Sequence, residues 1–73
     1  MQETKNRQLF VHIYNAFRKN HMLIAVHPHI PAELTVDEIK NRYGLRDRHT
    51  AYIKEPSGER IYVVRHPEWR GTR

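Results

Sequence analysis

Apolar residues in the first third of the chain recur at helical spacing. One stripe follows i, i+3, i+4 and i+7, and two further residues widen it; its members are Phe10, Ile13, Tyr14, Phe17, Leu9 and Ala16. Thr4 can cap a helix that begins there, and Arg18 and Lys19 suit the dipole at its end. The pattern predicts a helix over residues 4–22 whose aromatic side chains belong to the core.

The middle of the chain predicts a short extended run and then a second helix. Residues 22–26, MLIAV, indicate a buried strand or an extended connection, and the prolines of HPHIP exclude a helix after it. Residues 35–43, TVDEIKNRY, predict a helix because Thr35 and Glu38 have the spacing of a capping box. Gly44 follows as a natural residue to end that helix in the left-handed conformation.

Residues 52–65, YIKEPSGERIYVVR, predict a β-hairpin. Pro56 and Gly58 are typical of its turn. Folding the chain about Ser57 pairs Lys54 with Arg60, Ile53 with Ile61, Tyr52 with Tyr62, and Ala51 with Val63. This register gives one apolar face and one aromatic, basic face. The Lys54–Arg60 pair is repulsive, and an anionic partner, or Glu55 and Glu59 nearby, would relieve it.

Residues 45–55 also fit a helix, and this second interpretation stays open beside the hairpin. Residues 35–65 as a whole resemble a helix-turn-helix followed by a wing, as in winged-helix DNA-binding domains. The resemblance implies that residues 45–53 are a recognition helix with Arg46, Arg48 and His49 facing the major groove. If residues 49–54 are a strand instead, the helix that carries Lys40, Asn41 and Arg42 has to do the reading.

The expected fold is therefore α+β, a small winged-helix-like domain with two main helices and a C-terminal β-hairpin. At 73 residues the chain predicts a single domain spanning 1–73, with residues 1–3 and 70–73 frayed. Trp69, in the tail after the hairpin, is expected to fold back on the core or on a partner. A core this small, without disulfides, favours support from a second copy or another partner.

Composition indicates where the protein is located and shows that its charge is unevenly distributed along the chain. The chain has no cysteine, which is typical of a reducing compartment, and no apolar run or leader that predicts a membrane or secreted protein, so we expect a cytoplasmic one. Residues 1–38 hold four Lys and Arg against four Asp and Glu, whereas residues 39–73 hold nine against four. The whole excess of +5 lies in the second half, where it would attract a polyanion.

The basic and aromatic residues of the second half are the candidate nucleic-acid site. They combine phosphate-binding cations with flat rings: Lys40, Arg42, Arg46, Arg48, His49, Lys54, Arg60, Arg65, Tyr52 and Tyr62. His27 and His29, with His21, resemble a metal site only weakly, so no metal or other cofactor is expected. No nucleophile, phosphate-loop or metalloprotease motif is present, and we do not expect an enzyme.

The predicted function is that of a small basic protein that binds nucleic acid, with duplex DNA favoured, as a transcriptional regulator or accessory factor. A homodimer is compatible with this function. The alternative is a protein-binding inhibitor or adaptor that docks on a larger acidic partner. Its anchors would be Trp69 and the tyrosines of the hairpin, Tyr52 and Tyr62.

Overall fold

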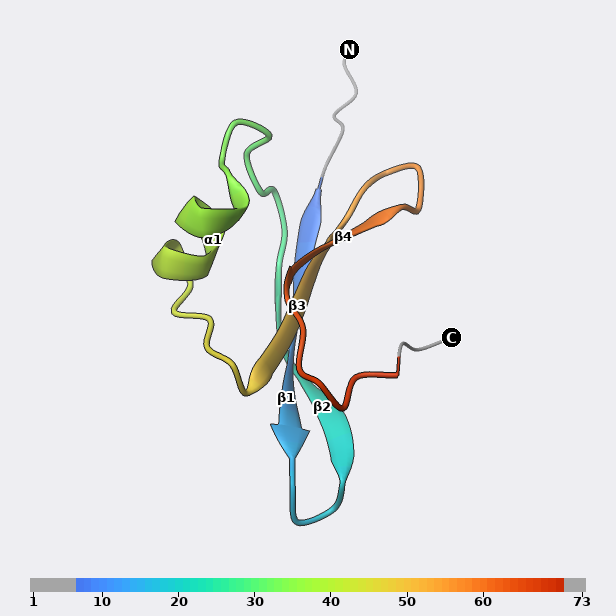
Figure 1. Cartoon of the computed structure of the whole chain (residues 1–73). Helices are drawn as coiled ribbons and strands as arrows, with labels where there is room; N and C mark the ends of the chain where they lie inside the picture. The colour runs from blue at the N-terminus through green and yellow to red at the C-terminus, as the bar shows by residue number, and fades with distance from the viewer. Residues whose placement is uncertain (1–6, 71–73) are drawn as a thin grey trace.

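The computed structural model describes residues 7–70, and in this range the chain forms one four-stranded sheet and one short helix (Figure 1). The elements in chain order are β1 (Gln8–Asn15), β2 (Asn20–His27), α1 (Val36–Arg42), β3 (His49–Lys54) and β4 (Arg60–Val64). Their order across the sheet is β2-β1-β3-β4, and every neighbouring pair is antiparallel. α1 covers one face, and the segment after β4 lies on the other.

The core lies between the sheet and α1, and it is aliphatic. Alternate residues of β1 and β3 point into it, as the two-residue period of a half-buried strand requires. α1 contributes Ile39, which is fully buried, and the loops contribute Ile30 and Leu45. The buried cluster consists of Leu9, Val11, Ile30, Ile39, Leu45, Ala51, Ile53 and Val63.

The predicted N-terminal helix over residues 4–22 is wrong, because residues 8–27 form the β1–β2 hairpin. Leu9 and Val11 are buried while Gln8 is exposed, so these positions alternate at the period of a strand. The chain reverses at residues 16–19, where the Asn15 side chain accepts a hydrogen bond from the Arg18 N–H (3.0 Å). The predicted stripe mixed residues of one strand with residues of its turn, and Phe17 at the tip is 95% exposed.

The second predicted helix is confirmed as α1. Thr35 Oγ1 accepts from the Glu38 N–H (3.2 Å), and Glu38 Oε1 accepts from the Thr35 N–H (2.8 Å). The capping box inferred from the sequence is thus fully formed. Gly44 has a φ of +64°, the left-handed conformation that ends a helix at little cost in a glycine.

The β3–β4 hairpin has the predicted register over three of its four pairs. Lys54 faces Arg60, Ile53 faces Ile61 and Tyr52 faces Tyr62, but Ala51 faces Val64. The register shifts between Ala51 and Tyr52, so that Val63 becomes an additional residue in a β-bulge and still points into the core. Sequence spacing counts residues one for one and cannot show such a shift.

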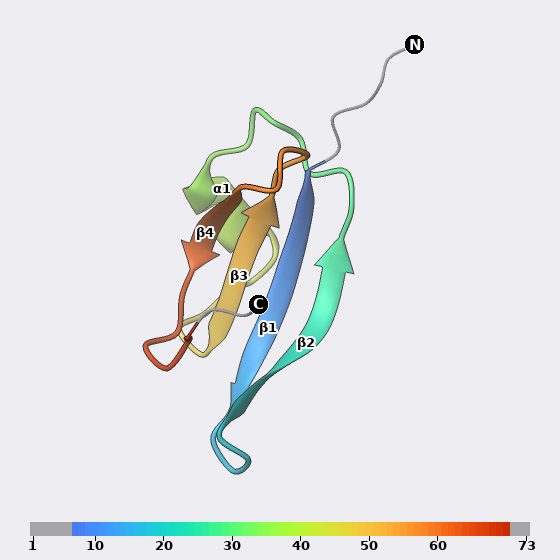
Figure 2. The same ribbon diagram turned by 90° about the vertical axis from the view of Figure 1, so that its right-hand side faces the viewer.

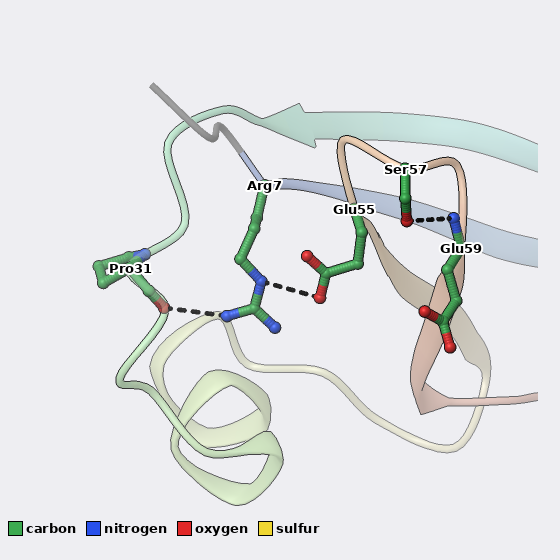
Figure 3. Close-up of polar contacts among 5 residues, drawn as sticks. All are labelled: Arg7, Pro31, Glu55, Ser57 and Glu59. Atoms are coloured by element: carbon green, nitrogen blue, oxygen red, sulfur yellow. Dashed lines mark hydrogen bonds and ion pairs between the residues drawn. The ribbon is translucent and has the colours of Figure 1, made fainter. Parts of the chain in front are cut away.

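Arg7 joins the start of β1 to the β3–β4 turn. Its Nε lies 3.3 Å from Glu55 Oε2, and one of its terminal nitrogens donates to the carbonyl oxygen of Pro31 (3.4 Å) (Figure 3). Glu55 is therefore engaged by Arg7 and not by Lys54 or Arg60, so of the two sources of relief that the sequence suggested, the ion pair with Glu55 is not formed. Within residues 7–70, neither Glu55 nor Glu59 pairs with these two cations.

The winged-helix-like architecture is contradicted. It required two main helices, whereas the described chain has one helix of seven residues and most of its regular structure is strand. Residues 45–48 are a loop and residues 49–54 are β3, so the recognition helix over residues 45–53 is wrong as well. The expected cap at Thr4 and the expected fraying of residues 1–3 and 70–73 lie, apart from residue 70, outside the described residues. Among residues 7–70, no helix has the length and apolar character needed to cross a membrane.

Candidate nucleic-acid interface

Three aromatic rings lie in a row across the helix-free face of the sheet. Phe10 of β1 pairs in register with Tyr52 of β3, and Tyr52 pairs with Tyr62 of β4. The Phe10 and Tyr52 rings stack with centroids 5.5 Å apart and an angle of 18°, and the Tyr52 and Tyr62 centroids lie 5.4 Å apart. Tyr52 is buried at the centre of the row, whereas Phe10 and Tyr62 on either side are partly exposed.

Basic side chains border this row. The Arg60 guanidinium lies 4.8 Å from the centre of the Tyr52 ring, and that of Arg65 lies 5.3 Å from the centre of the Tyr62 ring. These are cation–π distances. Lys54 is exposed beside Arg60, its cross-strand neighbour. We call Phe10, Tyr52, Tyr62, Lys54, Arg60 and Arg65 the ring-and-arginine patch.

The other half of the same face is covered by the segment after β4. Trp69, only 4% exposed, lies 5.0 Å from the ring centroids of both His12 and His21. Its indole Nε1–H donates to the Tyr62 hydroxyl (3.1 Å). We call residues 65–70 the C-terminal strap. The sequence-based expectation was that Trp69 folds back on the core or on a partner; it folds back on the chain's own sheet, but on the ring side and not on the aliphatic core.

A backbone hydrogen bond and a ring stack attach the start of the strap to the sheet. The His66 N–H donates to Thr50 Oγ1 (2.9 Å), which satisfies the single buried polar residue of the described chain. The His66 ring stacks on Tyr14 with centroids 4.5 Å apart. The strap therefore ends β4 and crosses the sheet toward β1 and β2.

His12 lies under the strap in surroundings that disfavour its protonation. Burial lowers the pKa of His12 below its ordinary value of 6.5; an interaction with the Thr50 backbone opposes this, and the charges of His21 and Arg60 add to it. Both ring nitrogens of His21 are shielded from solvent and have no hydrogen-bond partner within the described chain. A proton added to His12 would place a charge among rings and near Arg60.

The remaining basic candidates gather on the helix side of the sheet, around the loop between α1 and β3. A shallow open hollow of about 530 Å³ is lined by Lys40, Leu45, Arg46, Asp47 and Arg48. His49 holds the loop that lines this hollow, because its Nδ1 accepts a hydrogen bond from the Arg46 N–H (3.0 Å). Burial, and then the charge of Arg48, lower the pKa of His49 from 6.5. Asp47 offsets part of the positive charge of this hollow.

The structure thus divides the predicted site into two groups. Tyr52, Tyr62, Lys54, Arg60 and Arg65 come together on the helix-free face, whereas Lys40, Arg46, Arg48 and His49 lie around the loop between α1 and β3. Arg42 is exposed in the last turn of α1 and does not line the hollow.

Sequence reasoning missed the contribution of β1 to the ring face. Phe10, His12 and Tyr14 were assigned to a helix, although they alternate with Leu9, Val11 and Ile13 at a period of two. That alternation was the available signal. The histidines that weakly resembled a metal site lie apart: His21 faces Trp69 under the strap, while His27 packs on Tyr43 on the helix side. Within residues 7–70, no three His, Asp or Glu side chains are placed to hold a metal ion.

No protein-family model, curated protein sequence or solved structure matches this chain. Its function has to be inferred from the chemistry of its own surface.

Proposed function

We propose that this protein binds single-stranded nucleic acid on the ring-and-arginine patch. The observation that carries the proposal is the in-register row Phe10–Tyr52–Tyr62 with Arg60 and Arg65 over its rings. Flat rings stack on unpaired bases whatever their sequence, and neighbouring cations bind the phosphates between them. Within the patch, Phe10 and Tyr62 offer the accessible ring surfaces, and buried Tyr52 supports both.

Single strands are favoured over duplex DNA because the predicted recognition helix is absent and α1, the other candidate, is short. Reading a major groove takes a helix or a ribbon that fits into it; within residues 7–70 no helix follows Gly44, and α1 has only seven residues. A four-stranded sheet with rings on its open face suits splayed bases better. A role in transcription was inferred from the winged-helix resemblance, and the proposal no longer depends on it.

The unrelieved repulsion between Lys54 and Arg60 supports the same surface. The two cations face each other across β3 and β4, and neither Glu55 nor Glu59 pairs with them within residues 7–70. A phosphate placed between them would interact favourably with both charges.

The proposal includes a cytoplasmic location, which the absence of cysteine supports.

Fluorescence anisotropy with labelled oligonucleotides tests the proposal. Single-stranded DNA, single-stranded RNA and a duplex of the same sequence are titrated with the protein at two salt concentrations. We expect single strands to bind more tightly than the duplex, with affinity that falls as salt rises. Trp69, the only tryptophan, lies against Tyr62 and gives an independent fluorescence signal.

A pair of double variants locates the binding surface. Lys54→Gln with Arg60→Gln should weaken binding and reduce the slope of log K against log salt by about 1.4, as expected for two lost phosphate contacts on a single strand. Arg46→Gln with Arg48→Gln removes the same charge from the helix-side hollow and serves as the control. Equal losses in both variants would show that net charge alone drives binding, and tighter binding of the duplex would move the site off the patch.

The alternative function, docking on a larger acidic protein, would use the same basic surface. Trp69 is a poor anchor for such a partner, because it is buried on the chain's own rings. Absence of binding to every oligonucleotide, together with capture of one acidic protein that depends on Lys54 and Arg60, would favour this alternative.

A further inference from the structure

β2 is one of the two outer strands of the sheet, and its outward edge is open. It pairs with β1 alone, and Figure 2 shows no other described segment along its outer side. An outer strand presents a row of unpaired backbone N–H and C=O groups to solvent. With eight residues, β2 offers a row long enough to accept a second strand.

β2 lacks the charged residues that usually protect such an edge. Its sequence, NHMLIAVH, contains no Lys, Arg, Asp, Glu, Pro or Gly. Four of its apolar side chains are exposed to solvent by 40% or more: Met22 (45%), Leu23 (53%), Ile24 (51%) and Val26 (40%). Four exposed apolar residues within five positions, interrupted only by the partly buried Ala25, indicate an interaction surface.

The opposite edge is built differently. β4 has five residues, begins with Arg60 and is followed directly by Arg65. Short length and terminal cations discourage the addition of another strand. β2 is therefore the single edge of the described sheet suited to pairing.

We infer that β2 pairs antiparallel with β2 of a second copy of this chain. The molecule carries a net charge of +5, so two copies repel each other over most of their surfaces. An edge without charged residues is the place where two such copies can approach. A two-fold axis between Leu23 and Ile24 sets Leu23 against Ile24, Met22 against Ala25 and Asn20 against His27, and it places His21 opposite Val26. No Lys, Arg, Asp or Glu of one copy therefore faces another across the edge.

Pairing through β2 closes at two copies. The resulting eight-stranded sheet has β4 of each copy as its outer strands, and both carry the arginines that discourage further growth. The axis stands normal to the sheet, so the two helix-free faces lie on the same side; this consequence bears on binding only if the proposed function is correct.

Sedimentation velocity over a range of protein concentrations tests the inference. We expect a monomer–dimer equilibrium that persists or strengthens as salt rises, because salt screens the repulsion between two cationic copies. Nucleic-acid binding is expected to weaken with salt, so the two proposals fail independently. A monomer at all concentrations up to the millimolar range overturns the inference.

Two valines with equal exposure supply a matched pair of variants. Val26 in β2 and Val36 at the start of α1 are each 40% exposed. Val26→Lys should abolish the dimer, because it sets a charge on the edge, and Val36→Lys should leave it intact. Circular dichroism verifies that both variants are folded. A dimer that survives Val26→Lys and also Ile24→Lys would place the association elsewhere on the molecule and overturn the inference.

A cross-linking measurement covers the case in which the lysine variants do not fold. The chain has no cysteine, so Leu23→Cys introduces a single thiol close to the proposed axis. Antiparallel pairing brings the two copies of residue 23 within disulfide range, and oxidation should link most of the protein into covalent dimers. Val36→Cys is the control. Equal cross-linking of the two variants contradicts pairing through β2.

Discussion

The two faces of the sheet are covered in different ways. The helix side is aliphatic and is closed by α1 and the loops that flank it, with Ile39 fully buried at its centre. The other side carries aromatic rings, imidazoles and arginines, and the short C-terminal strap covers one half of it. The first face needs no hydrogen bonds from its side chains, whereas the second depends on ring contacts, on Thr50 and on Trp69.

This difference separates stability from function in the molecule. Aliphatic packing is insensitive to pH and salt, so the helix side holds the sheet under all ordinary conditions. We expect the ring side to respond to protons, and to salt and anions if it binds nucleic acid as proposed, because it carries arginines and imidazoles. We therefore expect variants of the first face to unfold the chain, and variants of the second to change binding with smaller effects on folding.

The largest effect is expected for Ile39→Ala on the helix side. The substitution leaves a cavity under α1 and should lower the free energy of unfolding by about 2–5 kcal/mol, which is a large fraction of the total for a small domain. Urea denaturation measures it. Val36→Ala, on the same helix but 40% exposed, is the control and should change stability by less than about 0.5 kcal/mol. Similar losses in the two variants would mean that α1 does not close the core.

Trp69→Ala should be the most damaging change on the ring side. It removes a buried side chain and should cost about 1.5–3 kcal/mol, less than a central core residue because the strap can be released locally. Near-ultraviolet circular dichroism should lose its aromatic signal while the far-ultraviolet signal of the sheet remains.

Trp69→Phe is the matched variant on the strap. It keeps a ring against His12 and His21 but loses the hydrogen bond to the Tyr62 hydroxyl, so the expected loss is about 0.5–1.5 kcal/mol. Loss of all far-ultraviolet signal in Trp69→Ala would show that the two faces fold as one unit and would remove the distinction between them.

Acid should weaken the ring side before the helix side. Because burial holds the pKa of His12 below 6.5 in the folded chain, the unfolded chain takes up the proton first as pH falls. The contribution of neutral His12 is therefore fully present above pH 6.5 and is lost as pH falls through 6.5 toward the lower pKa of the folded state. Urea denaturation at a series of pH values between 7.5 and 5 measures this loss.

His12→Gln removes the titrating group and should flatten this pH dependence. His49 also has a lowered pKa, but it lies in the loop on the helix side, so His49→Gln is the comparison. The pH dependence of stability should be reduced more by His12→Gln, which acts under the strap, than by His49→Gln. An unchanged pH dependence in His12→Gln would exclude His12 as its source.

The sequence predicted those parts of the fold whose determinants lie within a few residues. The capping box of Thr35 and Glu38 and the pairing of Tyr52 with Tyr62 both depend on local spacing, and both are present in the structure. β1 was missed because its segment satisfies two periods at once. Pairing with β2 on one side and β3 on the other selects the strand, and those contacts join residues far apart in the chain.

The candidate site shows the same limit. Lys54, Arg60 and the two tyrosines could be placed on one face from the register of the hairpin alone. Phe10 completes the ring row only because β1 lies beside β3, and the strap covers His12 only because the chain crosses the sheet after β4. Neither crossing has a local sequence signal. The wrong assignment of Arg46, Arg48 and His49 to a recognition helix followed from the resemblance of residues 35–65 and not from periodicity alone.

The smallest change in stability is expected for Lys54→Glu, which tests stability and binding in a single variant. The change turns the repulsive pair with Arg60 into an attractive one and should stabilise the hairpin by about 0.2–1 kcal/mol. The same change places a negative charge in the ring-and-arginine patch, so binding of single-stranded oligonucleotides should weaken. Thermal melting and fluorescence anisotropy measure the two effects on one protein.

Arg48→Glu makes the same change of charge on the helix-side loop, where no cross-strand cation faces it, and is the control for both measurements. It should not raise the melting temperature and should weaken binding less than Lys54→Glu. A variant that gains stability and loses binding at position 54 indicates that the chain keeps an unfavourable pair for the sake of an anion. If Lys54→Glu is stabilised and binds as well as the native protein, that repulsion has no connection with binding, and the patch loses one of its main supports.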